Sequence, residues 1–166
     1  MIRNIGLALV SIAILWLGGR AIYRALASDE TKIRWKIEDA RQGFENTRMD
    51  PILDLFARDY RDESLGFSRD DLRAGLASVF FQEKDPATKG FPFRAEIPAE
   101  DLSIEIGADG AQTARVKMRV RIRDVRKGDN GMAWEFRVDA QLANGDDGWR
   151  ITHTTNDTIR GSSRLK

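Results

Sequence analysis

The chain of 166 residues has no cysteine and a single histidine, His153. Without thiols it has no disulfide bond, no thiolate-bound metal and no cysteine nucleophile. One histidine is too few for a histidine-rich metal cluster, and the sequence has neither a glycine-rich phosphate loop nor a G-x-S-x-G nucleophile elbow. We therefore expect neither a bound metal nor a cofactor.

The chain also lacks an excess of either charge, because 27 lysine and arginine residues face 26 aspartate and glutamate residues. A dedicated nucleic-acid-binding protein usually has a clear basic excess, so nucleic acid is not an expected partner. The length is sufficient for one domain with a proper hydrophobic core and too short for two.

One long uncharged run lies at the N-terminus, where residues 5–19 read IGLALVSIAILWLGG between Arg3 and Arg20. As a helix it is roughly 22 Å long, against roughly 30 Å for the hydrocarbon core, but Arg20 and Arg24 can extend their charged ends to the interface. We predict that residues 1–27 are a membrane anchor. Two alternatives stay open: a signal segment cleaved at the A-x-A motif of residues 25–27, and a buried core helix.

The sequence contains opposing signals for the side of the membrane. The basic residues after the run would keep the globular part in the cytoplasm under the positive-inside rule. The short basic N-terminal tail and the A-x-A motif are typical of exported chains. We expect a single-pass protein of the cell membrane with a periplasmic or extracytoplasmic domain, or a secreted domain if the segment is cleaved.

Three helices are predicted in the first half of the remaining chain. Apolar residues at helical spacing predict one helix over residues 30–47 and a second over residues 50–60, with Pro51 at the tolerated first position. Ser68 and Asp71 resemble a capping box, which begins a third helix that extends to about Glu83.

Turns rich in glycine and aspartate divide the second half into four predicted strands, at about residues 93–106, 111–125, 132–143 and 149–158. Pro98 interrupts the first of them. The predicted fold is α+β, with the three N-terminal helices packed on one face of a curved antiparallel four-stranded meander and preceded by the hydrophobic helix. The domain comprises residues 28–160, and residues 161–166 form a flexible tail.

A cation stands at every second position of the stretch RVKMRVRIR, residues 115–123. Side chains alternate across a strand, so these cations point outward while the apolar residues between them point to the core. Glu105, Glu135 and Asp139 on the flanking strands are the expected ion-pair partners. The outward set, called the basic face below, is Arg115, Lys117, Arg119, Arg121 and Arg123.

Three interpretations of the basic face stay open. The first is a solvated face with ion pairs. The second is a docking face for an acidic protein, a second subunit or anionic headgroups. The third, a face for nucleic acid, is less favoured, because no outward aromatic residue is interleaved for base stacking.

The order of elements, with the stretches DPILDLFARDYRDES, SRDDLRAGLASVFF and DGWRITHTT, resembles the nuclear transport factor 2-like superfamily, a cone-shaped α+β fold. The resemblance covers residues 29–158. It implies two kinds of function: enzymes such as ketosteroid isomerases and polyketide cyclases, with acid–base residues inside the cone, and non-catalytic members, some of them tethered to membranes, that act in protein–protein contacts. It also implies dimerisation through the outer face of the sheet.

The inward-facing residues bear on the choice between these functions. The two central strands present no inward aspartate or glutamate, which argues against acid–base chemistry. His153 is predicted to share the inward face of Trp149, where it is either a hydrogen-bonded core group or a general base. Tyr60, near the end of the second helix, is a second candidate at the mouth of the cone. The predicted pocket lining is Trp134, Phe136, Met118, Trp149 and Phe80.

We therefore favour a non-catalytic, membrane-tethered interaction domain. Its expected partners are the membrane, through the N-terminal helix, and a second copy or an acidic protein on the outer sheet face. The alternative is a small-molecule-binding or isomerase/cyclase-like cone with a pocket around His153 and Tyr60.

Overall fold

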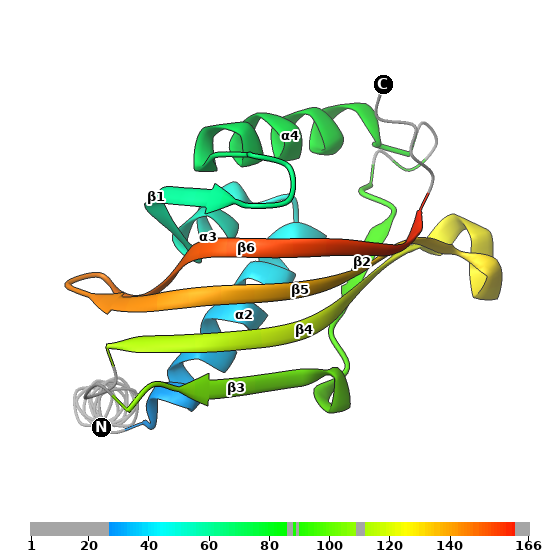
Figure 1. Ribbon diagram of the computed structural model, residues 1–166. Coiled ribbons are helices and arrows are strands. Elements are labelled where there is room, and N and C mark those ends of the chain that lie inside the picture. The colour runs from blue at the N-terminus through cyan, green and yellow to red at the C-terminus, as the bar shows by residue number, and fades with distance from the viewer. Residues whose placement is uncertain (1–26, 86–87, 89, 109–111, 162–166) are drawn as a thin grey trace, which may run out of the picture.

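The computed structural model describes residues 27–85, 88, 90–108 and 112–161 (Figure 1). The predicted anchor, apart from its last residue, and nearly all of the predicted tail lie outside these ranges. Within them, no helix is both long enough and apolar enough to cross a membrane.

The first helix of the domain, α2 (Asp29–Glu45), confirms the prediction for residues 30–47. Ser28 is its N-cap, and the Ser28 side chain accepts a hydrogen bond from the backbone N–H of Thr31, which would otherwise have no partner. Ile33 and Ile37, one turn apart, are buried on the side of the helix that faces the sheet.

The prediction of a second helix over residues 50–60 is wrong beyond Asp54. The helix α3 (Met49–Asp54) is followed at once by a strand, β1 (Phe56–Asp62). The backbone N–H of Ile151 donates to the carbonyl of Leu55 at 2.8 Å, and β1 then runs parallel to the last strand. The edge of that last strand needs hydrogen-bond partners, and pairing with it outweighs the local preference for a longer helix.

The third helix, α4 (Arg69–Gln82), begins as predicted. The Ser68 hydroxyl accepts from the backbone N–H of Asp71, and the Asp71 carboxylate accepts from the backbone N–H of Ser68 at 2.9 Å. This reciprocal capping box fixes the start of the helix.

The sheet has six strands rather than four, and it is not wholly antiparallel. Its order is β1-β6-β5-β4-β2, and β3 also pairs with β4. Pro98 divides the first predicted strand into two short pieces that pair with successive stretches of β4. The remaining elements are β2 (Phe93–Glu96), η1 (Ala99–Asp101), β3 (Leu102–Ile106), β4 (Thr113–Asp124), η2 (Val125–Asn130), β5 (Met132–Gly145) and β6 (Gly148–Gly161).

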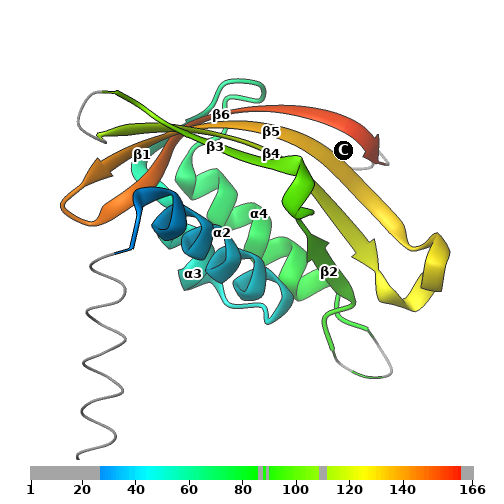
Figure 2. The ribbon, with the colours of Figure 1, turned by 90° about the horizontal axis from the view of Figure 1, so that it is seen from below.

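The strands curve over the helices, which lie together on the concave side of the sheet (Figure 2). As predicted, one face of the sheet is therefore covered and the other is open. The core between the layers contains Ile33 and Ile37 of α2 together with Val116, Ala140 and Ile151 of the central strands. This arrangement confirms the predicted α+β class with a curved sheet.

Candidate functional site

His153 is exposed, so its predicted inward direction is wrong. Gln141 of β5 pairs with His153, whereas the next residue, Leu142, pairs with Ile151, which leaves Thr152 as an extra residue in β6. Such a β-bulge reverses the alternation of side chains beyond it. His153 is thereby placed on the open side, and Thr154 takes the inward position.

The bulge creates a buried polar cluster between β1 and β6. We call it the Tyr60 cluster, and its members are Tyr60, Asp62, Thr154 and Asn156. The Thr154 hydroxyl donates to Asp62 Oδ2 at 2.8 Å, so its oxygen is left to accept from the Tyr60 hydroxyl at 2.7 Å. Asn156 Nδ2 also donates to Asp62 Oδ2, and the backbone N–H of Leu65 donates to Asp62 Oδ1 at 2.7 Å.

Tyr60, Asp62 and Thr154 satisfy one another and are shielded from water, and the half-buried Asn156 closes the edge of the Tyr60 cluster. The exposed fractions are 6% for Tyr60, 3% for Asp62 and 4% for Thr154. Burial, with a smaller contribution from the charge of Asp62, raises the pKa of Tyr60 above its ordinary value. A general acid or base needs a free side toward substrate, which these groups lack. The arrangement instead fastens the edge strand β1 to β6.

Asp62 and Asp124 are the buried carboxyls that sequence reasoning missed, and Asp124, the last residue of β4, corrects the expectation that the central strands present no inward acid. The sequence-based boundary placed residues 50–60 in a helix and left Asp62 in the loop after it. A strand over residues 56–62 puts Tyr60 and Asp62 on the same side, two residues apart. The alternation of buried and exposed positions is too short here to have been detected without the partner strand.

A pocket of about 530 Å³ opens at the η2 end of the sheet. We call it the η2 pocket. The rings of Phe93 and Trp134 line it, with 5.4 Å between their centroids. Arg126 places its guanidinium 5.8 Å from the centre of the Phe93 ring, and Asp124 holds it there through hydrogen bonds of 2.8 and 2.7 Å. Hydrogen bonds from Arg126 hold the pKa of Asp124 below its ordinary value, so this buried carboxyl is ionised at neutral pH.

The residues predicted to line one pocket lie in two places. Phe80 and Trp134 belong to one aromatic cluster, linked through Phe91 and Phe93 by contacts of 5.2, 5.5 and 5.4 Å between ring centroids. Phe136 is half-buried. The other two are core residues, with Met118 9% and Trp149 2% exposed.

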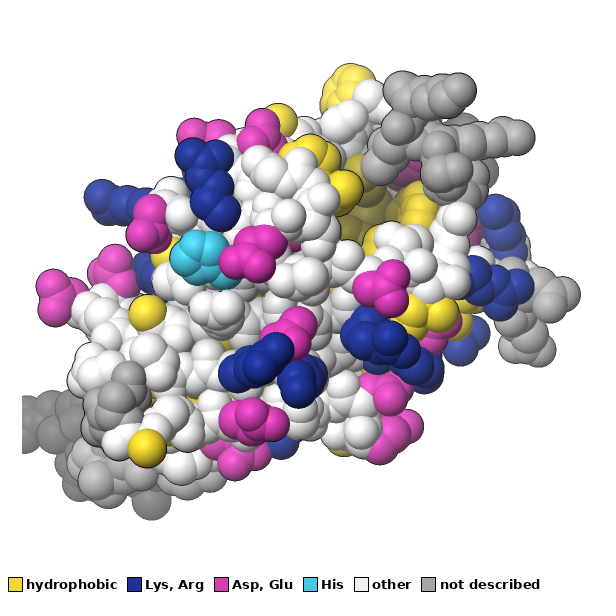
Figure 3. Space-filling view, in the orientation of Figure 1, with side chains coloured by type: hydrophobic (Ala, Val, Ile, Leu, Met, Phe, Trp, Pro, Cys, Tyr) yellow, Lys and Arg dark blue, Asp and Glu magenta, His cyan; other side chains and the backbone are white. Residues whose placement is uncertain are grey.

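The basic face lies outward, and most of its cations have carboxylate partners. Arg115 pairs with Asp139 at 2.6 Å, and both Arg119 and Arg121 approach Glu135, at 3.7 and 3.2 Å. Two further partners were not foreseen: Asp101, at 3.1 Å from Arg121, and Glu96, at 2.9 Å from Arg123. Figure 3 shows cations and carboxylates intermixed on this side. Such pairs contribute about 0.2–1 kcal/mol each, and they leave little charge free for an acidic partner.

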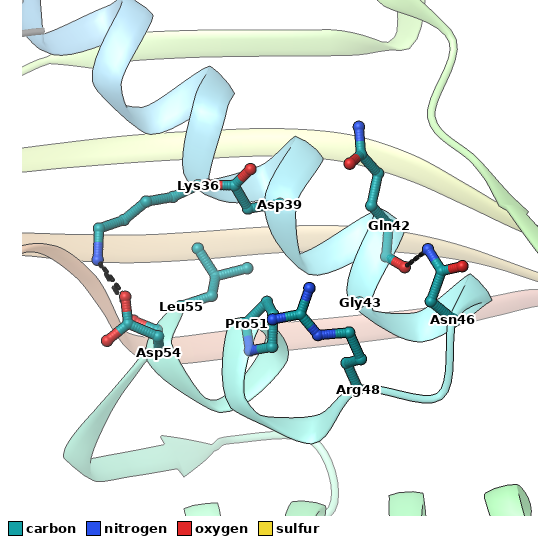
Figure 4. Close-up of a pocket in the computed structure, with 9 residues that line it drawn as sticks. All are labelled: Lys36, Asp39, Gln42, Gly43, Asn46, Arg48, Pro51, Asp54 and Leu55. Carbon is teal, nitrogen blue, oxygen red and sulfur yellow. Dashed lines mark hydrogen bonds and ion pairs between the residues drawn. The ribbon is translucent and has the colours of Figure 1, made fainter. Parts of the chain in front are cut away.

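A smaller polar groove of about 300 Å³ separates α2 from α3 (Figure 4). Gly43 allows the two helices to approach, because a Cβ there would lie 3.0 Å from the Arg48 carbonyl oxygen. Lys36 and Asp54 face each other across the groove in an ion pair of 2.9 Å. Charges of both signs line the groove, so it favours neither an anion nor a cation. Among the described residues, no group of three or more histidine, aspartate or glutamate side chains is placed to hold a metal ion.

The second half of α4 presents an uncharged surface. Residues 74–82 read AGLASVFFQ, and six of these nine side chains or glycine positions are exposed. Phe81 is 82% exposed, and Phe67, just before the helix, is 51% exposed. The charged residues of α4 all lie between Arg69 and Arg73. We call five of these exposed residues the α4 face: Ala74, Gly75, Ala77, Ser78 and Phe81.

No protein-family model matches the sequence, and no curated protein matches it. Many solved structures match in fold. A cystatin-like protein of unknown function from Nostoc punctiforme has a TM-score of 0.62 and 13% identity, covering 82% of this chain and 95% of its own. A nuclear transport factor 2-like protein of unknown function from Pseudomonas putida has a TM-score of 0.62 and 15% identity. The match covers 82% of the chain described here and 91% of that protein.

A third structure, named as a proposed aromatic ring hydroxylase from Novosphingobium aromaticivorans, has a TM-score of 0.57 and 16% identity, covering 80% of this chain and 90% of its own. At such identities the likeness concerns the fold and not the activity. The chain described here has the cystatin-like fold of the nuclear transport factor 2-like proteins.

Proposed function

We propose that this chain is a non-catalytic interaction domain, held at a membrane by residues 1–27, that associates with a second copy of itself through the α4 face. The observation that carries the proposal is the lack of charge on an exposed helix surface. A surface helix normally has a polar outer side, whereas residues 74–82 are uncharged all round and most of them are exposed. Phe81, 82% exposed among small uncharged residues, is a large apolar side chain that a contact with another protein would bury.

The α4 face is complementary to itself. Ala74 and Phe81 are seven residues apart and lie on the same side of the helix, opposite the buried Phe80 and half-buried Leu76. An antiparallel second helix, with the two-fold axis between residues 77 and 78, brings each Phe81 against the Ala74 of the other copy. A large side chain then meets a small one twice, as a two-fold contact requires.

The contact is small, which explains the role of a tether. A helix of 14 residues offers a strip of roughly 21 Å by 10 Å, about 200 Å² per copy, against roughly 800 Å² per partner in a stable complex. Association in dilute solution is therefore expected to be weak. Anchoring both copies in one membrane raises their effective concentration and favours the same contact without new interactions.

The enzymatic alternative built on His153 and Tyr60 is less favoured by the geometry. His153 lies outside the concave face, and the Tyr60 hydroxyl is enclosed by its hydrogen-bond partner. The α4 face, by contrast, is open to a partner.

Cysteine cross-linking tests the proposal directly, because the natural chain has no cysteine. In Ser78→Cys, the two thiols would lie beside the two-fold axis, within the 4.4–6.8 Å between Cα atoms that a disulfide needs. In the matched control Asp70→Cys, on the same helix, they would be roughly 22 Å apart along the axis. Lys117→Cys reports on contact through the outer sheet face.

Oxidation of the full chain in membranes should yield a covalent dimer for Ser78→Cys only. A covalent dimer for Lys117→Cys alone would place the contact on the outer sheet face. It would overturn the proposal that the two copies associate through the α4 face. A cross-link from Ser78→Cys to a protein of another mass would overturn self-association. No cross-link at any position would contradict the interaction function.

Tethering has its own test. The full chain should remain in the membrane pellet after alkaline carbonate extraction, with an intact mass that includes residues 1–27. Recovery of a shortened chain in the soluble fraction would show cleavage and contradict the anchor.

A further inference from the structure

We propose that the η2 pocket is a binding site for a small amphiphilic anion, a flat apolar or aromatic body that carries a carboxylate or a similar acidic group. This inference does not depend on the α4 face.

The apolar part of the site is a pair of aromatic rings. Phe93 is 3% exposed and fixed by its contacts, whereas Trp134 is half-buried and lines the opening. Gly161 of β6 pairs with Trp134 of β5. A Cβ at residue 161 would lie 2.6 Å from Trp134 Cδ1, and because glycine has no such atom, the indole is left uncovered on this side. Flat apolar groups bind to such ring surfaces through burial and offset stacking.

The lining of the pocket has one cation more than it has acids, and the carboxylate of Asp85 also acts on Arg126. Three cations, Arg126, Lys127 and Arg160, line the pocket with two acids, Glu83 and Asp124. The carboxylate of Asp124 is already bound by the Nε and Nη2 atoms of Arg126, and Lys127 lies 3.9 Å from it. Within the part of the chain that the structure describes, neither Arg160 nor Glu83 forms an ion pair, so the rim has one free acid against the two cations Arg160 and Lys127. The free donors at the rim are therefore cationic, which favours an anionic group on the ligand.

Size and position agree with a small ligand. The volume of about 530 Å³ lies within the range of roughly 300–1,000 Å³ that is common for small-molecule sites. The buried Asp124 fixes the Arg126 guanidinium over the Phe93 ring, so the cationic and aromatic parts of the pocket are held together before any ligand arrives.

The test uses the full chain in detergent micelles, labelled with 5-fluorotryptophan, and 2-naphthoate as the probe. The chain has four tryptophans, so the Trp134 resonance can be assigned with Trp134→Phe and followed by fluorine NMR. The other resonances report whether a variant is folded. Empty micelles provide the blank, and uncharged 2-naphthamide is the matched probe that lacks the acid.

The Trp134 resonance should shift saturably with 2-naphthoate, and 2-naphthamide should bind about tenfold more weakly. The double variant Lys127→Glu/Arg160→Glu should weaken naphthoate binding about tenfold, whereas Arg73→Glu, an exposed cation on α4, should change it less than about twofold. Gly161→Val should abolish binding of both probes, since its side chain displaces the indole.

Four results would overturn the proposal. Equal affinity for the two probes, or naphthoate binding that is unchanged by the double charge reversal, would mean an apolar cleft without preference for anions. Binding that survives Gly161→Val would place the ligand elsewhere. A Trp134 resonance that does not respond to 2-naphthoate would mean that the pocket is not a site for this class of ligand.

Discussion

Replacing Asp62 by asparagine keeps the shape of the side chain but removes its charge and converts one acceptor oxygen into a donor. In the folded protein, Asp62 Oδ1 accepts from the backbone N–H of Leu65, and Asp62 Oδ2 accepts from Thr154 and Asn156. All three neighbours are donors. Whichever way the new amide is turned, its NH₂ group faces at least one of them.

The expected cost follows from this conflict. A buried donor without a partner destabilises a protein by about 1–3 kcal/mol, and the remaining bonds lose the strength that the carboxylate charge provides. We therefore expect Asp62→Asn to lower the free energy of unfolding by about 2–3 kcal/mol, a large part of the roughly 5–15 kcal/mol typical of a domain. The control is Asp59→Asn, exposed on the same strand, with an expected change within about 0.5 kcal/mol.

Urea unfolding, followed by far-UV circular dichroism, measures both variants against the natural chain. The comparison requires equal dependence of the unfolding free energy on urea, so that a shifted midpoint reports stability alone. A cost below about 0.5 kcal/mol for Asp62→Asn would refute the structural role of the Tyr60 cluster. A protein that kept its stability but lost binding of a ligand would instead support a chemical role for Asp62.

Three further predictions use the same unfolding measurement. Gly131→Ala should destabilise the chain by about 2 kcal/mol or more, because its Cβ would lie 2.3 Å from a backbone oxygen. Gly75→Ala, on the exposed side of α4, should stabilise the chain by about 0.5–1 kcal/mol. A stabilising Gly131→Ala or a destabilising Gly75→Ala would contradict the local geometry. The hydrogen bond from Trp149 lowers the pKa of Asp29. The stability difference between the natural chain and Asp29→Asn should therefore be largest above the ordinary aspartate pKa of about 3.9 and shrink as the pH falls below it. A stability difference that does not change with pH would contradict this. Arg121→Ala removes a cation that pairs with two carboxylates of the outer face and should cost about 1 kcal/mol, and no measurable change would mean that these pairs are solvated.

Signals carried by neighbouring residues were sufficient for much of the fold. The capping box at Ser68 and the break at Pro98 are local, and the structure has both of them where they were predicted. The outward direction of the basic face follows from simple alternation along β4, and in its first half Arg115 and Lys117 are exposed between the buried Ala114, Val116 and Met118.

Features that depend on pairing between distant segments could not be predicted from a single sequence. The strand β1 forms because β6, whose paired residues lie more than 90 positions later in the chain, has a free edge for it. The bulge at Thr152 is a property of the β5–β6 pair, and it alone reverses the directions of His153 and Thr154. The one extra residue in β6 therefore moved the candidate histidine outward and brought a threonine to Asp62.

The most direct test of the account is hydrogen–deuterium exchange of residues 74–82, measured on the full chain in membranes and on the same chain dispersed in excess detergent. Self-association through the α4 face predicts slower exchange of these amides in membranes, with no matching change in the first turn of α4. Equal exchange in the two states would contradict the central claim that this helix is an interface.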